Sequence, residues 1–426
     1  MISGPALAAT DTAALSTDVL IAGAGPAGCA AAITLARAGR RVLLIDQHDF
    51  PRDKICGDGL IPDSMQALQT LGVLEAVRRA ATPVKGLACH GPRGGTLYIP
   101  GDLAVLPRKV LDACLFERAQ AMGATTLTGT RYLDPIRDDK GRVTGAHVNV
   151  DGMPRQINAD WTILATGATV SALQSADHCT RALPSAMALR AYVRNPGFLD
   201  DEDKPIEHLH ISWHKSYAPG YGWIFPCPDG VYNIGVGLYG MHEGGWRAKL
   251  AALPGLGEVK PKKLNLAELF RQFTDHNPMA RRLIQTGTMI GEIKGAPLRC
   301  SLEGAKPASA GLLVTGEAMG STYALTGEGI GKAMETGILS AQAILEHSDV
   351  HAVCQAYENM LKALAPKFAI YQQANKINRA PWLIDLAINR GNKSPRLVRR
   401  MSLVLEERAN PAKLFTLRGA WKFLTE

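Results

Sequence analysis

The stretch from Asp18 to Asp46 constrains the fold of this chain more than any other. A short apolar run, Val19–Ala22, precedes the spacing G-x-G-x-x-G at 23–28, and an Ala-rich segment leads to a second apolar run, Val42–Ile45. In such an arrangement the first glycine permits a tight turn, the second lets backbone approach a pyrophosphate, and the third lets a helix pack against a strand. The sequence therefore predicts a dinucleotide-binding strand–helix–strand unit.

Several residues of this unit are predicted to touch the dinucleotide directly. Its phosphates are expected on the free N–H groups at the start of the helix. Asp46, eighteen residues after Gly28, is placed to accept hydrogen bonds from a ribose hydroxyl. The predicted contacts of this unit are Gly23, Gly25, Pro26, Ala27, Gly28, Asp46 and Gln47. A purely structural glycine turn is the alternative, and it would leave the terminal acid unexplained.

Size, charge and cysteine usage bound the remaining possibilities. With 426 residues the chain is long enough for roughly two or three domains. Its net charge of +8 would suit acidic substrates, anionic lipid or nucleic acid, but no nucleic-acid motif accompanies the charge. The eight cysteines include no C-x-x-C pair, which favours a reducing compartment and argues against a zinc knuckle. The first sixteen residues are interpreted as a loose leader rather than a signal peptide, so a cytoplasmic protein is expected.

Later segments supply further parts of a nucleotide site. Arg108 begins a predicted helix, and residues 161–167 form a predicted buried strand ending in A-T-G. Residues 311–317 predict another buried strand, which ends in glycine and an acid. This strand is followed by L-T-G-E-G-I at 325–330 and a helix to about Glu346.

These parts occur together in one superfamily. On them the chain resembles the FAD-dependent oxidoreductases related to para-hydroxybenzoate hydroxylase, and within these it is most similar to the geranylgeranyl reductase family. The resemblance covers most of residues 17–346. Three motifs carry the narrower assignment: C-G-D-G-L at 56–60, P-G-Y-G-W-I-F-P at 219–226 with N-I-G-V-G at 233–237, and L-T-G-E-G-I at 325–330.

The resemblance implies FAD as the cofactor and places further residues at it. In the family, the first motif lies beside the flavin ring, the second lines the substrate cavity, and the third lies at the flavin. The additional residues implied to contact FAD are Cys56, Gly57, Asp58, Gly59, Arg108, Thr166, Gly167, Gly316, Glu317, Thr326, Gly327, Gly329 and Ile330. A helix that begins near Gly329 and points at the flavin N1/O2 edge would stabilise the negative charge of reduced flavin.

Two features depart from the superfamily pattern. Glu317 stands where an aspartate usually contacts the ribityl or pyrophosphate region, and its longer side chain can reach the same hydroxyl. Residues 318–324 lack the Pro-rich, His-containing run common in the aromatic hydroxylases. The second departure favours a reductase over a hydroxylase.

The second motif predicts a wall for the substrate. Tyr221, Trp223 and Phe225 alternate, so a strand would place all three on one face. The resemblance implies that this face lines the substrate cavity, and large aromatic faces suit an apolar or aromatic small molecule. Cys56 is expected to line the same site without a covalent or redox role.

The histidines of the middle region do not predict a metal site. No acid or cysteine near His208, His210 and His214 completes a ligand set. Because alternate histidines on a strand are usually exposed, we interpret them as surface residues.

The implied architecture is of the α/β (α+β) class, with a Rossmann-like FAD-binding domain, an interleaved antiparallel-sheet substrate domain and a C-terminal helical region. We assign residues 17–82, 101–180 and 290–348 to the FAD-binding domain, 83–100 and 181–289 to the substrate-binding domain, and 349–426 to the helical region. Basic residues between 389 and 400 usually form a solvated face, but with a lipid-like substrate they also suit peripheral contact with an anionic membrane.

The function implied by the resemblance is reduction of a carbon–carbon double bond in an apolar, isoprenoid-like substrate by hydride transfer from flavin N5. A flavin monooxygenase acting on an aromatic or alkene substrate shares the cofactor and fold and is the alternative. The halogenase branch fits less well, because its W-x-W-x-I-P signature is Y-G-W-I-F-P at 221–226. A non-catalytic FAD-binding module is a third interpretation. No second glycine-rich fingerprint marks a site for NADPH or NADH, so this expected donor would dock transiently or be replaced by another protein.

Overall fold

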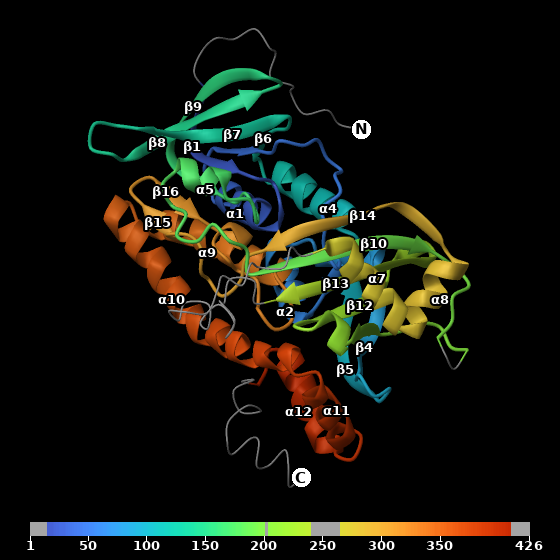
Figure 1. The fold of residues 1–426 in the computed structure, drawn as a ribbon. Coiled ribbons are helices and arrows are strands. Elements are labelled where there is room, and N and C mark those ends of the chain that lie inside the picture. The colour runs from blue at the N-terminus through green and yellow to red at the C-terminus, as the bar shows by residue number, and fades with distance from the viewer. Residues whose placement is uncertain (1–14, 201–202, 240–264, 410–426) are drawn as a thin grey trace, which may run out of the picture.

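The computed structural model describes residues 15–200, 203–239 and 265–409 (Figure 1). They form two β-sheets, helices packed around them and a helical C-terminal part. We call the sheet that contains the N-terminal strand sheet A and the other sheet B; within the described residues each has eight strands. The mixed α/β class with a Rossmann-like unit is confirmed. The exact domain boundaries stay a prediction.

Sheet A carries a parallel core. Its strands in spatial order are β15 (Ala308–Ser309), β16 (Leu312–Val314), β9 (Met153–Leu164), β1 (Leu15–Ala22), β2 (Val42–Ile45) and β6 (Thr125–Leu127), while β8 (Val143–Val150) joins β9 to β7 (Thr130–Arg137). From β16 to β6 neighbouring strands run parallel. Parallel sheets are covered on both faces, which explains why the runs Val19–Ala22 and Val42–Ile45 are buried. Ligands are expected at the edge where the carboxyl ends of such strands meet.

Helices with small side chains cover sheet A. Helix α1 (Pro26–Arg37) packs against α9 (Ile330–Glu346) and α4 (Arg108–Ala121), and α2 (Pro62–Leu71) also contacts α9. A Cβ on Gly337 would lie 2.2 Å from the carbonyl oxygen of Ala27, so only glycine allows α9 to approach α1 this closely. The close approach brings the first turns of α1 and α9 to the same edge of sheet A.

Sheet B is built from two separate stretches of chain, 59–105 and 186–298. Its strands in spatial order are β14 (Thr288–Leu298), β10 (Ala186–Arg194), β13 (Val231–Tyr239), β12 (Gly220–Pro226), β11 (Leu209–Ser212), β4 (Thr82–His90), β5 (Thr96–Val105) and β3 (Gly59–Leu60). Helix α7 (Leu266–His276) packs on one face, where a Cβ on Gly222 would lie 2.2 Å from the Phe273 ring. The opposite face of β12 carries the alternating aromatic residues.

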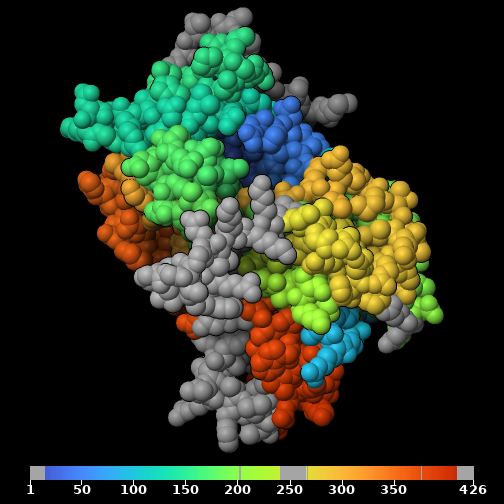
Figure 2. Space-filling model, in the orientation of Figure 1, coloured from blue at the N-terminus to red at the C-terminus, as the bar shows by residue number. Residues whose placement is uncertain are grey.

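The C-terminal part is helical, as predicted, within the described residues. The remaining helices are α3 (Leu74–Ala80), α5 (Ser171–Ser175), α8 (Pro278–Thr286), α10 (Val350–Ala374), α11 (Trp382–Gly391) and α12 (Pro395–Leu405). Helices α11 and α12 pack on the β4–β5 hairpin, and Figure 2 shows these red helices against the cyan hairpin. Among the helices described, none is both long and apolar enough to span a bilayer. Residues 410–426 and most of the expected leader lie outside the described residues.

One expectation about β11 is wrong. The alternation predicts His210 at the surface, but its side chain is buried. Its Nδ1 lies 2.9 Å from Nε2 of His90 on β4, and the two rings stack. The reason is that β11 is an interior strand between β12 and β4. Burial, with smaller effects of His90 and His208, lowers the pKa of His210 to about 3. In the described parts of the chain, no three potential metal ligands come together.

Candidate active site

A cavity of about 710 Å³ lies where the carboxyl edge of sheet A meets sheet B. The predicted cofactor contacts that line it are Gly23, Gly25, Pro26, Ala27, Asp46, Gln47, Cys56, Gly57, Asp58, Gly59, Arg108, Thr166, Gly167, Glu317, Thr326, Gly327, Gly329 and Ile330. Gly28 and Gly316 lie behind the lining, where they let α1 pack closely. Residues far apart in the sequence therefore share one cavity, and their contacts with a cofactor stay predictions.

The three glycines of the first turn have different surroundings. Gly23 has a φ of +104°, and a Cβ there would lie 2.4 Å from the backbone oxygen of Ala165, the residue after β9. A Cβ on Gly28 would lie 1.8 Å from the carbonyl oxygen of Gly23. At Gly25 the nearest atoms to a Cβ would be Nη2 of Arg52 at 3.8 Å and Nη2 of Arg108 at 3.9 Å. Packing requires the first and third glycines, whereas Gly25 leaves accessible backbone between two guanidinium groups.

Arg52 and Arg108 share one buried carboxylate. Arg108, in the first turn of α4, donates from Nε and Nη2 to the two oxygens of Asp112 at 2.6 and 2.8 Å. Nη1 of Arg52 donates to Oδ2 of the same Asp112 at 3.0 Å. Burial alone would lower the pKa of Arg108, but the charge of Asp112 outweighs this effect, so the pKa is raised above its ordinary value. The two cations are thereby fixed beside Gly25, in a geometry that suits phosphate oxygens.

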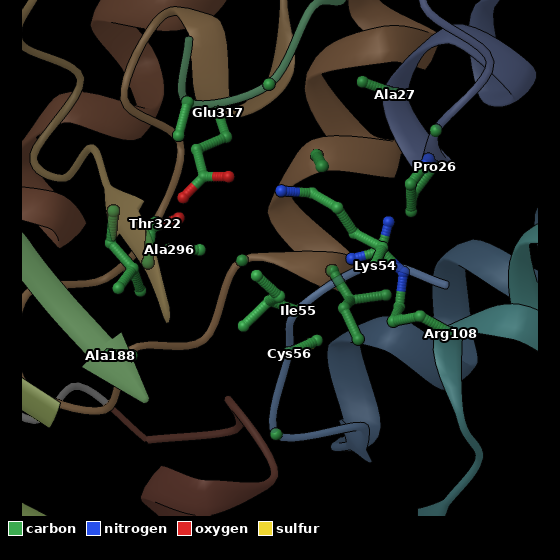
Figure 3. A pocket seen from close by; sticks show the side chains of 18 of the residues that line it. Pro26, Ala27, Lys54, Ile55, Cys56, Arg108, Ala188, Ala296, Glu317 and Thr322 are labelled. Carbon is green, nitrogen blue, oxygen red and sulfur yellow. The ribbon is translucent and has the colours of Figure 1, made fainter. Parts of the chain in front are cut away.

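Other atoms at the cavity also fit a dinucleotide. Arg52 and Thr166 line the cavity, and Nε of Arg52 and Oγ1 of Thr166 have no hydrogen-bond partner among the described residues. Lys54 and Glu317 extend into the cavity from opposite sides (Figure 3). Burial raises the pKa of Glu317, and Lys54 is the largest influence that lowers it. Phosphates would find cations near Gly25, and hydroxyl groups would find an acceptor at Glu317.

Asp46 lies after β2 as predicted and also supports the glycine turn. Its Oδ2 accepts a hydrogen bond from the backbone N–H of Ala24 at 2.9 Å, and its Oδ1 accepts one from the backbone N–H of His48 at 3.0 Å. Nη2 of Arg52 lies 3.5 Å from Oδ2. Because each carboxylate oxygen can accept more than one hydrogen bond, these contacts leave capacity for a ribose hydroxyl.

The C-G-D-G loop is held in place by Asp58. Its carboxylate is fully buried, and Oδ2 accepts hydrogen bonds from Tyr192 at 2.5 Å and from Asn233 at 2.7 Å. Asn233 also donates to the carbonyl of Cys56 at 2.8 Å, so the second motif positions the first. Burial, partly offset by these hydrogen bonds, raises the pKa of Asp58 to about 6. Burial likewise raises the pKa of the Cys56 thiol, which favours its protonated form.

The second motif forms an aromatic wall. The alternating aromatics of β12 share one face, as their spacing predicts, and all three line the cavity. Nε1 of Trp223 donates to Oδ1 of Asn233 at 2.8 Å. A Cβ on Gly235 would lie 2.2 Å from the Trp223 ring, which explains why this position of β13 must be glycine. Tyr221 stacks on Tyr239 with ring centroids 5.6 Å apart.

The third motif lies against this wall. The hydroxyl of Tyr221 donates to the carbonyl of Thr326, and the hydroxyl of Tyr239 donates to that of Tyr221 at 3.0 Å. Helix α9 begins after Gly329 without a side-chain cap, and both Gly329 and Ile330 line the cavity. The free N–H groups and the positive dipole end of a long helix therefore lie at this part of the cavity.

Sequence reasoning missed several lining residues, among them Arg52, Lys54, Arg190, Tyr239 and Glu328. Arg52 and Lys54 lie in the aperiodic loop after β2, where only their charge could have marked them. Arg190 of β10 reaches this loop through an ion pair of 2.7 Å with Asp53. Such contacts depend on the pairing of segments that are distant in the sequence, and local sequence patterns do not predict this pairing.

Comparison with known proteins agrees with this geometry. The FAD binding domain family matches residues 16–185. The menaquinone reductase of Mycolicibacterium smegmatis is 31% identical over 338 residues, which cover 76% of this chain and 75% of that protein. The chain belongs to the geranylgeranyl reductase family of FAD-dependent oxidoreductases. The resemblance predicted from the three motifs is thus confirmed.

Other similar proteins place this geranylgeranyl reductase family member in the same fold. The digeranylgeranylglycerophospholipid reductase of Methanoculleus marisnigri is 29% identical over 340 residues, covering 76% of this chain and 75% of that protein. The solved structure of a geranylgeranyl bacteriochlorophyll reductase-like protein from Thermoplasma acidophilum has a TM-score of 0.75 at 19% identity, covering 95% of this chain and 99% of that one. A flavin-dependent brominase reaches 0.73 at 20% identity, covering 96% and 99%. At such identities these structures show the shared fold alone.

Proposed function

We propose that this enzyme reduces a carbon–carbon double bond of an apolar, isoprenoid-like substrate. The observation that carries the proposal is one cavity that is lined by the glycine turn, Arg52 and Arg108 on the sheet A side and by an apolar wall on the sheet B side. The wall consists of Leu87, Leu209, Ile211, Tyr221, Trp223, Phe225, Tyr239 and Leu405. Such a surface suits a hydrocarbon chain, because burial contributes about 25 cal/mol for each Å² of apolar area.

The chain's own residues would bind and orient both partners. We propose that Gly25 and the first turn of α1, with Arg52 and Arg108, hold the pyrophosphate of FAD, and that Glu317 accepts from its hydroxyl groups. When bound and reduced, FAD supplies a hydride. The aromatic wall would hold the double bond in place and exclude water from it.

The names of two relatives support the substrate class. One is named for menaquinone and another for digeranylgeranylglycerophospholipid. These compounds differ in their head groups, but both carry isoprenoid chains. We therefore propose for this enzyme only the isoprenoid part that both compounds share, and neither head group.

Anaerobic single turnover tests the proposed function. The FAD-loaded enzyme, reduced with dithionite, is mixed with menaquinone bearing a geranylgeranyl side chain, or with geranylgeranyl diphosphate. We expect mass spectrometry to show two added hydrogen atoms in the isoprenoid chain, which persist after exposure to air. Addition of hydrogen only at the quinone ring, which air would reverse, would contradict the proposal. Turnover that requires oxygen would instead support the alternative, a flavin monooxygenase.

The electron donor is a further part of the proposal. We propose NADPH or NADH, docking transiently, because the chain carries one dinucleotide fingerprint and FAD would occupy it. Arg190 and Lys54 at the cavity are cations that suit a phosphate-bearing donor. Bleaching of the flavin absorbance on anaerobic addition of NADPH or NADH would support this, and its absence with both would point to a protein donor.

Peripheral contact with a membrane is proposed for the C-terminal helices. Trp382 at the start of α11 is 61% exposed, and Lys393, Arg396 and Arg399 are exposed nearby in the chain. An exposed tryptophan together with cations is typical of surfaces that bind anionic lipid. We expect sedimentation with vesicles that contain anionic lipid at low salt, and little with neutral vesicles. Equal binding to both kinds, or to neither, would contradict the proposal.

A further inference from the structure

A cluster of ionisable side chains lies next to the third motif, where α2, α9, α10 and the end of α12 meet. Nζ of Lys332 is buried and lies 3.4 Å from Oδ2 of Asp63, 2.7 Å from Oε2 of Glu335 and 3.3 Å from Oε2 of Glu407. Lys367 of α10 forms a second ion pair with Glu407 at 2.5 Å. None of these groups takes part in the proposed binding of FAD or of the substrate at the apolar wall.

Glu328 connects this cluster to the cavity. It directly precedes the Gly329 at which α9 begins, and it is among the residues that line the cavity. Its Oε1 is buried and has no hydrogen-bond partner in the described part of the chain. Burial first, and the neighbouring Asp63 carboxylate second, raise the pKa of Glu328 well above its ordinary value, while Lys332 partly offsets the rise.

Among the residues that the structure describes, the charges of the cluster leave one acid without a cation of its own. The groups that face one another are the acids Asp63, Glu328, Glu335 and Glu407, the lysines Lys332 and Lys367, and the phenols Tyr323 and Tyr371. Four carboxyl groups thus share two ammonium groups in a largely buried space. Repulsion and burial both favour a proton on the acid that has no ion pair with another described residue, which is Glu328.

We infer that Glu328 is the general acid that gives a proton to the substrate during reduction, an inference that rests on the proposed function. Saturating a carbon–carbon double bond adds a hydride to one carbon and a proton to the other. FAD, when bound and reduced, would supply the hydride, while the O–H bond of Glu328 breaks as the second C–H bond forms.

The same cluster stabilises the resulting carboxylate and restores its proton. Lys332 and the positive end of α9 favour the charged form of Glu328 once the proton has left. Glu335, which bonds to Lys332, has a side chain 35% exposed, so the cluster meets the solvent from which a proton must return to Glu328. The step is therefore balanced in charge and in protons over one turnover.

Single turnover of Glu328→Gln tests the inference without the unknown electron donor. Removing a general acid typically costs about 100- to 10,000-fold in rate, and we expect a loss of this size in side-chain saturation. FAD content and reduction by dithionite should match those of the wild type. Glu346→Gln changes an exposed acid at the end of the same helix and should convert substrate at the wild-type rate.

Two further measurements separate chemistry from folding. In FAD-free protein, infrared spectra at neutral pH should show the C=O band of a protonated carboxyl that Glu328→Gln loses and Glu346→Gln keeps. The general acid must be protonated, so the single-turnover rate should fall as pH rises through the pKa of Glu328. Asp63→Asn removes the nearby negative charge and should move this fall to lower pH by about 1 unit.

The outcomes distinguish this inference from the proposed function. Wild-type enzyme that saturates no double bond contradicts the proposed function and the general-acid role together, whatever the infrared spectra show. Wild-type enzyme that works while Glu328→Gln works equally fast overturns the role of Glu328 alone. An unchanged infrared carboxyl band in Glu328→Gln, or an unshifted pH profile in Asp63→Asn, would also overturn it.

Discussion

Gly25→Ala is expected to fold normally and to lose about 100- to 10,000-fold in FAD affinity, the equivalent of two charge-assisted hydrogen bonds. The new methyl group would meet only two guanidinium atoms at 3.8 and 3.9 Å, and the φ of −77° suits alanine. The free energy of unfolding should therefore change by no more than about 0.5 kcal/mol. The methyl group would instead occupy the space through which a pyrophosphate reaches the backbone.

Two other glycines make this prediction specific. Gly28→Ala places a Cβ 1.8 Å from a backbone oxygen and should prevent stable folding, so the two substitutions separate a packing role from a binding role. Gly197→Ala meets nothing within 4 Å and is the matched control. Thermal unfolding and titration of FAD-free protein with FAD give both readouts. Wild-type affinity in Gly25→Ala would show that the pyrophosphate does not pass this residue.

The double substitution Arg52→Gln with Arg108→Gln is expected to weaken FAD binding by about 100- to 10,000-fold. Each hydrogen bond to a charged group contributes about 1.5–3 kcal/mol, so each single change should cost about 10- to 100-fold. Glutamine is chosen because its amide can still donate to Asp112. Leaving that buried carboxylate without any partner would itself cost about 3–5 kcal/mol of stability.

Riboflavin provides the control on the ligand, because it lacks phosphate. We expect the double variant to bind riboflavin as the wild type does, and its remaining affinity for FAD to depend less on salt. Arg118→Gln changes an arginine of the same helix that donates to the carbonyl of Leu71, and should bind FAD normally. Equal losses for riboflavin and FAD would mean that the two arginines support the cavity rather than the phosphates.

The parts of the site that could be predicted from sequence are those encoded by local spacing. The glycines at 23, 25 and 28 each have a distinct physical requirement, and the alternation of Tyr221 and Trp223 fixes a common face of β12. Arg108 could be placed at a helix start because the helix pattern that follows it is regular. In each case a short stretch of sequence carries the prediction, although the atoms that enforce it can be distant, as the backbone oxygen of Ala165 is for Gly23.

The parts that could not be predicted depend on pairing between distant segments. Glu328 and Asp63 are 265 positions apart, and only the packing of α2 on α9 brings them together. His210 follows an alternating pattern that suits an exposed strand, yet its strand is interior because β4 pairs with it. An alternating pattern predicts which face of a strand carries a residue. It does not predict which other elements pair with the strand or pack on that face.

The path of the chain between the two sheets has a consequence for how such an enzyme can diversify. Within the described residues the chain passes from sheet A to sheet B and back twice, because β3–β5 and β10–β14 are separated by β6–β9. Neither sheet can therefore be exchanged by a single recombination event between genes. New specificities are more accessible through point substitutions on the cavity-lining face of an otherwise inherited scaffold, one wall residue at a time.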